Sequence, residues 1–352
     1  MQYTSIKTWL KPFSLLVKSK RLLFGTLSLL LFLSSYWSWL DYRNFIKTPI
    51  EFSVSEQNFV INKGTGINKL ASELSQKGLI ARPFYFKLLV TLNPKLNRLK
   101  AGEYRLEKSM TPEQMLNLFS QGQVIQYSFS IIEGQTAYQI IQNLKAETRL
   151  TQLSEQDQKA LNLALNLDFN NIEGWLFPDT YYFSKGDSAL SILKRSSLKM
   201  KAFLESEWTE RAENLPYQSI YQALIMASII EKETGIASER AQIAGVFVRR
   251  LQKRMRLQTD PTIIYGIGPS FNGDITRKDM KTPTPYNTYV IKGLPPTPIA
   301  MPSGEAIHAA LHPAAGSSLY FVADGTGGHY FSESLAEHQQ AVRRMLKRNK
   351  GR

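Results

Sequence analysis

The chain has 352 residues, no cysteine and a formal net charge of +14. This length is enough for two ordinary domains, and the missing cysteine excludes disulfides, thiolate metal sites and a cysteine nucleophile. The charge alone would suggest a nucleic-acid partner. However, many basic residues gather in two terminal tails, which are Lys7, Lys11, Lys18, Lys20 and Arg21 at one end and Arg343, Arg344, Lys347, Arg348, Lys350 and Arg352 at the other. We therefore expect no nucleic-acid partner.

Residues 22–40 carry no charge and follow the first basic cluster. A helix of this length spans about 28 Å, close to the thickness of the hydrocarbon core. Tyr36, Trp37 and Trp39 stand at its far end, as interfacial aromatic residues do. We expect a retained single-pass anchor with the N-terminus (residues 1–21) in the cytoplasm. A cleaved signal peptide is the alternative, but its usual cleavage signal is not evident.

Residues 41–160 are predicted to be short strands and short amphipathic helices. Thr65 is expected to cap a first helix that ends at Gly78, and Thr111 a second that ends at Gly122. A third helix is expected after Thr136. The first and third share a strand, a turn and a helix, which is a weak internal βα repeat. Such a module either binds a ligand or serves as a spacer.

The segment from residue 161 onward begins with an aromatic turn region, residues 173–182, that suits either a sugar-binding wall or a buried corner. Two irregular segments follow, at 255–262 and 282–302, of which the second is rich in proline. Long ordered loops of this kind are often binding elements. A short strand near residues 319–322 and a glycine-rich turn at residues 325–328 complete the region.

The sequence MASIIEKETG, at residues 226–235, is an apolar run that ends in two carboxylates. It predicts a helix that is buried on most sides and stopped by Gly235. Such a helix places Glu231 and Glu233 at the edge of a core, where desolvation raises the pKa of a carboxyl group. A raised pKa suits a general acid. The residues alone do not choose between the two glutamates, or exclude two solvated surface groups.

Taken together, these segments resemble the endolytic murein transglycosylases, the MltG or YceG-like family. The resemblance rests on several short motifs in order: EGWLFPDT at 173–180, ASIIEKET at 227–234, RLQTDPT at 256–262, TPTPYNTY at 282–289, GLPP at 293–296 and YFVADG at 320–325. It implies an inner-membrane enzyme that cuts nascent peptidoglycan strands internally. It also implies a LysM-like subdomain within residues 41–160, a catalytic domain at 161–345, and peptidoglycan synthases as possible partners. Residues 346–352 are then a basic tail.

The resemblance assigns the catalytic acid to Glu233. It implies cleavage of the β-1,4 bond between N-acetylmuramic acid and N-acetylglucosamine, which leaves a 1,6-anhydro end and needs neither a metal nor a cofactor. Candidates to bind the sugars are Glu173, Asp179, Gln258, Asp260, Asn287 and Tyr289, with Glu231 in a supporting role. The alternatives are a lysozyme-type hydrolase and a non-catalytic wall-binding protein. His308 and His312 are spaced as possible zinc ligands, but the rest of a metalloprotease motif is missing, so we expect no metal.

The expected fold class is α+β, with the catalytic domain in the periplasm. We expect the helices of that domain to surround a small sheet. The cleft is expected between the glutamate-bearing helix and the two proline-bearing loops.

Overall fold

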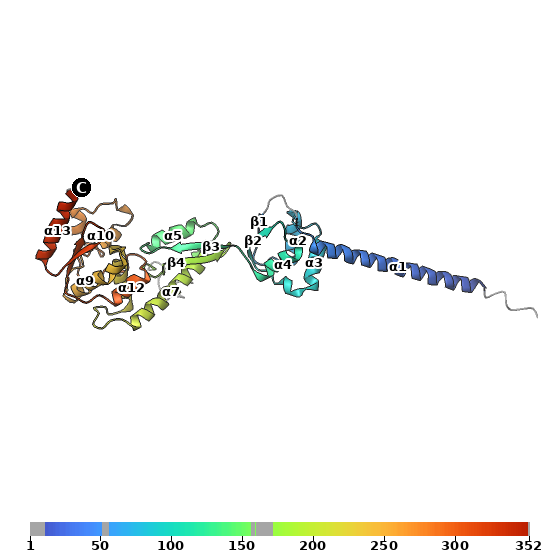
Figure 1. Ribbon diagram of the computed structural model, residues 1–352, viewed down its shortest axis with the longest axis horizontal. Coiled ribbons are helices and arrows are strands. Elements are labelled where there is room, and N and C mark those ends of the chain that lie inside the picture. Colours follow the sequence, from blue (N-terminus) through green and yellow to red (C-terminus); the bar gives the residue numbers. More distant parts are fainter. Residues whose placement is uncertain (1–10, 51–55, 156–158, 160–171, 351–352) are drawn as a thin grey trace, which may run out of the picture. The chain divides into compact units, whose positions relative to one another are not determined.

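The computed structural model describes residues 11–50, 56–155, 159 and 172–350. The first part of the predicted cytoplasmic tail, the end of the basic tail and the predicted boundary at residue 161 lie outside the described residues. Spatial contacts divide the chain into two compact units, Met1–Ile125 and Gln126–Arg352, and each is considered separately below (Figure 1). Both combine helices and strands, so the mixed helix-and-sheet class is confirmed.

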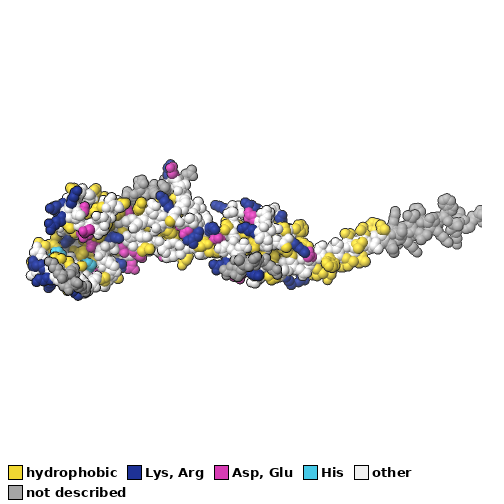
Figure 2. Space-filling view, turned by 90° about the horizontal axis from the view of Figure 1, so that it is seen from above, with side chains coloured by type: hydrophobic (Ala, Val, Ile, Leu, Met, Phe, Trp, Pro, Cys, Tyr) yellow, Lys and Arg dark blue, Asp and Glu magenta, His cyan; other side chains and the backbone are white. Residues whose placement is uncertain are grey.

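The first unit begins with α1, Lys11–Lys47, which contains the predicted membrane segment. Among the residues described, α1 holds the one stretch long and apolar enough to cross a membrane. Figure 2 shows hydrophobic side chains covering much of its described part. From Leu23 onward, where the burial of its side chains is described, α1 is exposed up to its last turns, in which Tyr42, Phe45 and Ile46 pack against the core of the unit.

Two strands and three α-helices complete the first unit: β1 (Glu56–Ile61), α2 (Ile67–Gln76), α3 (Pro83–Leu92), β2 (Gly102–Glu107) and α4 (Pro112–Gln121). A short 3-10 turn, Pro94–Asn97, precedes β2. The strands are antiparallel, with Phe59 opposite Tyr104 in the core. Thr111 caps α4 through a capping box, and Gly122 ends it in the left-handed conformation, as predicted. The predicted cap at Thr65 is wrong, because Gly66 is the N-cap of α2 and offers no side chain.

The second unit begins with β3 (Gln126–Ile131) and α5 (Ala137–Ala146), and β3 pairs antiparallel with β4 (Asp179–Ser184). Thr136 caps α5 through a second capping box. The β1–α2 and β3–α5 pairs are the predicted βα repeat, but they lie in different units. The second compact unit therefore begins at Gln126, earlier than the boundary at residue 161 that we expected from the sequence.

The core of the second unit is built around α8 (Ile220–Glu233), in which residues 223–230 are all buried. It packs against α7 (Ala189–Thr209), α9 (Arg240–Gln252), α10 (Asp260–Ile267) and α12 (Gly304–Leu311). The remaining elements are α11 (Arg277–Lys281), the hairpin β5–β6 (Tyr320–Ala323 and His329–Ser332), α13 (Leu335–Lys350) and the 3-10 turns Ala237–Glu239 and Gly268–Ser270. The expectation of helices around a small sheet is wrong, because an apolar helix that is buried on all sides takes the centre.

Candidate active site

The C-terminal end of α8 places Glu233 at the edge of the core. Ser219 caps the start of the helix by accepting a hydrogen bond from the backbone N–H of Gln222. The helix ends at Glu233, and Thr234 turns into extended backbone. Gly235, the predicted stop, does not adopt a positive φ. The end of α8 therefore comes from the change of direction at Thr234, and it leaves Glu233 on the last turn.

The carboxyl group of Glu233 is half-buried and accepts a hydrogen bond from the hydroxyl of Thr259. Its pKa is raised to about 7, mainly by burial and also by the negative charge of Asp260, while Thr259, His329 and Arg250 act in the opposite direction. The negative end of the dipole of α8 also disfavours the carboxylate. Glu233 can therefore hold a proton near neutral pH and release it, as a general acid and base must.

This raised pKa predicts a pH-dependent effect of Glu233→Gln on stability. Between pH 4.5 and 7 the folded protein keeps a proton that the unfolded chain has lost, so its free energy of unfolding falls as the pH rises. Glutamine does not titrate, so the Glu233→Gln variant lacks this fall in the free energy of unfolding. Relative to the parent, the variant should gain about 2 to 3 kcal/mol in going from pH 4 to pH 8. Urea unfolding of both proteins at the two pH values measures this gain, and a constant difference would contradict the raised pKa.

Glu233 opens onto a pocket of about 540 Å³ that also contains Gln258, Asp260 and Tyr289. Asp260 is the first residue of α10, and its Oδ1 accepts a hydrogen bond of 2.7 Å from the hydroxyl of Tyr289. The backbone N–H of Gln258 donates to the carbonyl oxygen of Thr288 at 3.2 Å. Four of the predicted site residues are thus brought together in one pocket, between the end of α8, the 255–262 segment and Tyr289.

Gln258 has a φ of +52°, which is unusual for a residue with a side chain. Glycine adopts this region without the penalty, although it is more flexible when unfolded. We expect Gln258→Gly to change the free energy of unfolding by less than about 1 kcal/mol and to raise the KM for glycan. Arg254→Gly is the matched control, because Arg254 has a φ of +53° and is exposed. It should change stability similarly and leave KM unaltered. Equal KM values for both variants would remove Gln258 from the binding site.

Asn287 and Asp179 do not line this pocket. Asn287 is buried, and its Nδ2 donates to the carbonyl oxygens of Asp279, Met280 and Thr282 at 2.9, 3.2 and 2.8 Å. It therefore ties the proline-rich loop to the end of α11. Asp179 is exposed at the start of β4 and pairs with Lys199.

Glu173 and Glu231 are also used elsewhere in the second unit. Glu173 is buried and accepts hydrogen bonds of 3.0 Å from the backbone N–H of Ala137 and from the hydroxyl of Tyr265. Burial raises its pKa to about 7, against the effect of these hydrogen bonds. Glu231 accepts a hydrogen bond of 3.0 Å from the backbone N–H of Ser303, the N-cap of α12. Glu173 joins α5 to the aromatic turn region, residues 173–182. Glu231 joins α8 to α12.

Another part of the pocket lining comes from β5, β6 and α13, which the sequence analysis did not connect with the site. His329 of β6 lines the pocket, and its Nδ1 lies 2.7 Å from Oε2 of Glu239. Arg250 is buried on α9, and its Nη1 donates to the carbonyl oxygen of Leu257 at 2.7 Å. His338 of α13 lines the same wall. The sequence signal for this part of the site was Arg250, an arginine on a helix that otherwise packs into the core.

His308 and His312 lie near Glu207 of α7, and ligand atoms of the three residues are within 4.8 Å of one another. Nδ1 of His308 is 2.8 Å from Oε2 of Glu207. None of these three residues lines the pocket that contains Glu233. The cluster is thus a separate feature of the α7–α12 surface.

Comparison with known proteins gives a consistent result. A model of the YceG-like family matches residues 59–344. The endolytic murein transglycosylase of Bacillus subtilis (strain 168) is 31% identical over 326 residues, which cover 87% of this chain and 89% of that protein. The protein of the same name from Streptococcus pneumoniae serotype 2 (strain D39) is 28% identical, and the match covers 90% of this chain but 64% of that longer relative.

A solved structure also matches. The crystal structure of a yceG-like protein from Listeria monocytogenes superposes with a TM-score of 0.51 at 32% sequence identity. The match covers 82% of this chain and 99% of the Listeria chain. The fold described above is therefore shared with an experimentally determined relative.

Proposed function

This chain belongs to the YceG-like family, and from that premise we propose that it is an endolytic murein transglycosylase, a lyase that cleaves peptidoglycan glycan strands internally. The observation that carries the proposal is the protonatable carboxyl group of Glu233 at the wall of a polar pocket. Enzymes that act on glycosidic bonds need an acid that is neutral at working pH.

In the proposed mechanism, Glu233 donates its proton to the oxygen of the β-1,4 bond between N-acetylmuramic acid and N-acetylglucosamine. The bond from C1 to that oxygen breaks, and N-acetylglucosamine leaves with a new hydroxyl group. The Glu233 carboxylate then takes the proton of the C6 hydroxyl of the muramic acid. That oxygen closes onto C1 and gives a 1,6-anhydro ring, so no water is consumed. One carboxyl group acts in turn as acid and base.

The other polar groups of the pocket have roles in this proposal. Gln258, Asp260 and Tyr289 bind the sugar and stabilise positive charge near C1. Because Tyr289 already donates to Asp260, the carboxylate is held in a fixed orientation. Glu173, Asp179 and Asn287 are assigned to the fold instead. Glu231 supports the site through its bond to the start of α12.

Asp260 is also the observation that favours a second candidate, a hydrolase of the lysozyme type. A second carboxylate in the pocket can act on a water molecule or on C1. Mass spectrometry of the products from purified glycan strands separates the two reactions. We expect 1,6-anhydromuramic acid ends that persist in Asp260→Asn at a reduced rate. Reducing ends alone would establish the hydrolase.

We propose that α1 anchors the enzyme in the inner membrane, with the N-terminus in the cytoplasm and the second unit in the periplasm. The basic residues before the apolar segment support this orientation. We propose that the LysM-like, glycan-binding subdomain lies in the first unit after α1. We also propose that the catalytic domain begins near Gln126, which the pairing of β3 with β4 supports. From the family alone, we also propose peptidoglycan synthases as partners. Protease digestion of intact spheroplasts should degrade the second unit and leave the N-terminal tail protected.

A further inference from the structure

Helix α3 is apolar on both of its faces. Phe86, Leu89 and Val90 pack into the core of the first unit. On the other side, Phe84 is 70% exposed and Leu92 is 59% exposed. These two residues and Leu88 follow one another at four-residue spacing, so they form a single stripe along the helix. An apolar stripe of this kind on an otherwise folded surface marks an interaction site.

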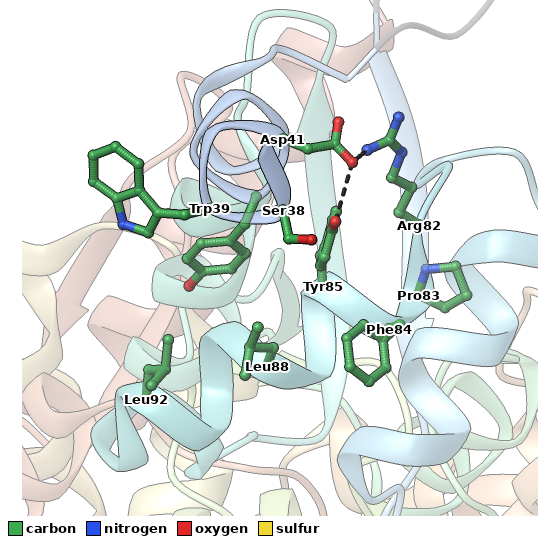
Figure 3. A pocket seen from close by; sticks show the side chains of 10 residues that line it. Ser38, Trp39, Asp41, Arg82, Pro83, Phe84, Tyr85, Leu88 and Leu92 are labelled. Carbon is green, nitrogen blue, oxygen red and sulfur yellow. Dashed lines mark hydrogen bonds and ion pairs between the residues drawn. The ribbon is translucent and has the colours of Figure 1, made fainter. Parts of the chain in front are cut away.

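The stripe forms one side of an apolar pocket whose other side is the end of α1. Figure 3 shows Trp39 and Ser38 of α1 beside Leu88 and Leu92 of α3. Asp41 joins the two helices, because it pairs with Arg82 and accepts a hydrogen bond of 3.0 Å from the hydroxyl of Tyr85. The pair fixes the start of α3 at the level where the uncharged segment of α1 ends. α3 is therefore held beside the end of the proposed membrane-spanning part of α1.

We propose that the α3 stripe, formed by Phe84, Leu88 and Leu92, inserts into the outer leaflet of the membrane at the boundary between headgroups and acyl chains. The inference rests on the proposed anchoring by α1. Three observations favour a lipid surface as the occupant: the stripe continues from the span through Trp39, Trp is enriched at this depth, and basic side chains stand around it. These are Arg43, which lies over the ring of Trp39, and Lys87 of α3, and both suit anionic headgroups.

The arrangement gives the enzyme a second contact with the membrane. A helix that lies in the interface buries its apolar face about 5 to 10 Å into the boundary. In the first unit, α3 lies at the side where α1 joins, and β1 and β2 lie at the opposite side (Figure 1). With both α1 and α3 engaged, the first unit cannot swing freely about a single helix, so its sheet faces away from the lipid.

The absence of cysteine makes a direct test available. Single cysteines replace Phe84, Leu92 or Asn58 in the full-length protein, and each is labelled with an environment-sensitive fluorophore. The proteins are reconstituted in vesicles of phosphatidylglycerol and phosphatidylethanolamine, with or without a lipid that carries a nitroxide quencher near the headgroup. Labels at 84 and 92 should show a blue-shifted emission that the nitroxide lipid quenches. The label at Asn58, an exposed residue of β1, should show neither change.

A fourth label at Phe32, in the uncharged segment of α1, separates this inference from the anchoring on which it rests. A nitroxide placed deep in the acyl chain should quench it. Quenching at Phe32 without quenching at 84 and 92 would overturn the insertion of α3 and leave the anchor intact. Blue-shifted but unquenched labels at 84 and 92 would overturn insertion and assign the stripe to a contact with a second copy of the protein instead. An unquenched label at Phe32 would overturn both proposals.

Discussion

Replacing Glu233 by glutamine is expected to lower the rate of glycan cleavage by about 1,000-fold. Glutamine has nearly the same shape as glutamate and still accepts a hydrogen bond from Thr259. It cannot donate an acidic proton to the leaving oxygen or later receive the proton of the C6 hydroxyl. Because both steps depend on one group, nothing else in the proposed mechanism replaces it. The rate is measured as soluble fragments released from purified glycan strands.

Glu205→Gln is the matched control, since Glu205 is an exposed carboxylate on α7 of the same unit. This variant should cleave glycan at the parental rate. Thermal unfolding of the Glu233→Gln protein should show a cooperative transition, which separates a chemical defect from a folding defect. A Glu233→Gln protein that cleaves as fast as the parent would remove this residue as the acid.

The second large effect is expected from Arg250→Gln, which should lower the free energy of unfolding by about 3 kcal/mol. Arg250 is only 7% exposed. Its Nε donates to the carbonyl oxygen of Leu319 at 2.6 Å, and its Nη1 to that of Leu257 at 2.7 Å. It thereby ties the segment before β5 to the segment that carries Gln258. Glutamine is too short to replace both contacts.

Arg250 also favours the ionised form of Glu233, so its removal should raise the pKa of that carboxyl group further. In the activity that remains, the loss of rate at high pH should move to a higher pH. Lys253→Gln is the control, because it removes the same charge from an exposed position near the end of α9. Urea unfolding and a pH profile of cleavage measure both effects. Equal stability of the two variants would show that Arg250 does not hold the two segments together.

The helix that bears the acid was predictable because its signal is local. The apolar run at residues 223–230 has no polar face, which is typical of a buried helix. Glu231 and Glu233 are about 200° apart around the helix axis, so the sequence indicates that they face different neighbours. Whether Glu231 or Glu233 faces the pocket depends on the positions of Thr259 and Ser303. No local pattern of α8 contains that information.

The full set of pocket residues was not predictable for two physical reasons, although Gln258, Asp260 and Tyr289 were among the candidates. Part of the lining comes from the β5–β6 hairpin and α13, whose approach to α8 depends on packing between segments far apart in the sequence. In addition, a polar residue in a proline-rich loop serves the loop or the ligand, and the sequence does not distinguish these uses. Asn287 satisfies carbonyl groups of Asp279 and Met280 in α11 and of Thr282 in its own loop, whereas its neighbour Tyr289 reaches the pocket.

The contribution of α13 to the pocket has a consequence for biogenesis. Leu335 and His338 belong to α13, the last of the described helices, and they line the same pocket as Glu233. Because α13 follows the other described elements of the second unit in sequence, a chain that folds as it emerges in order supplies this helix after the other residues of the pocket. The binding surface is therefore complete only after α13 has packed against the rest of the second unit.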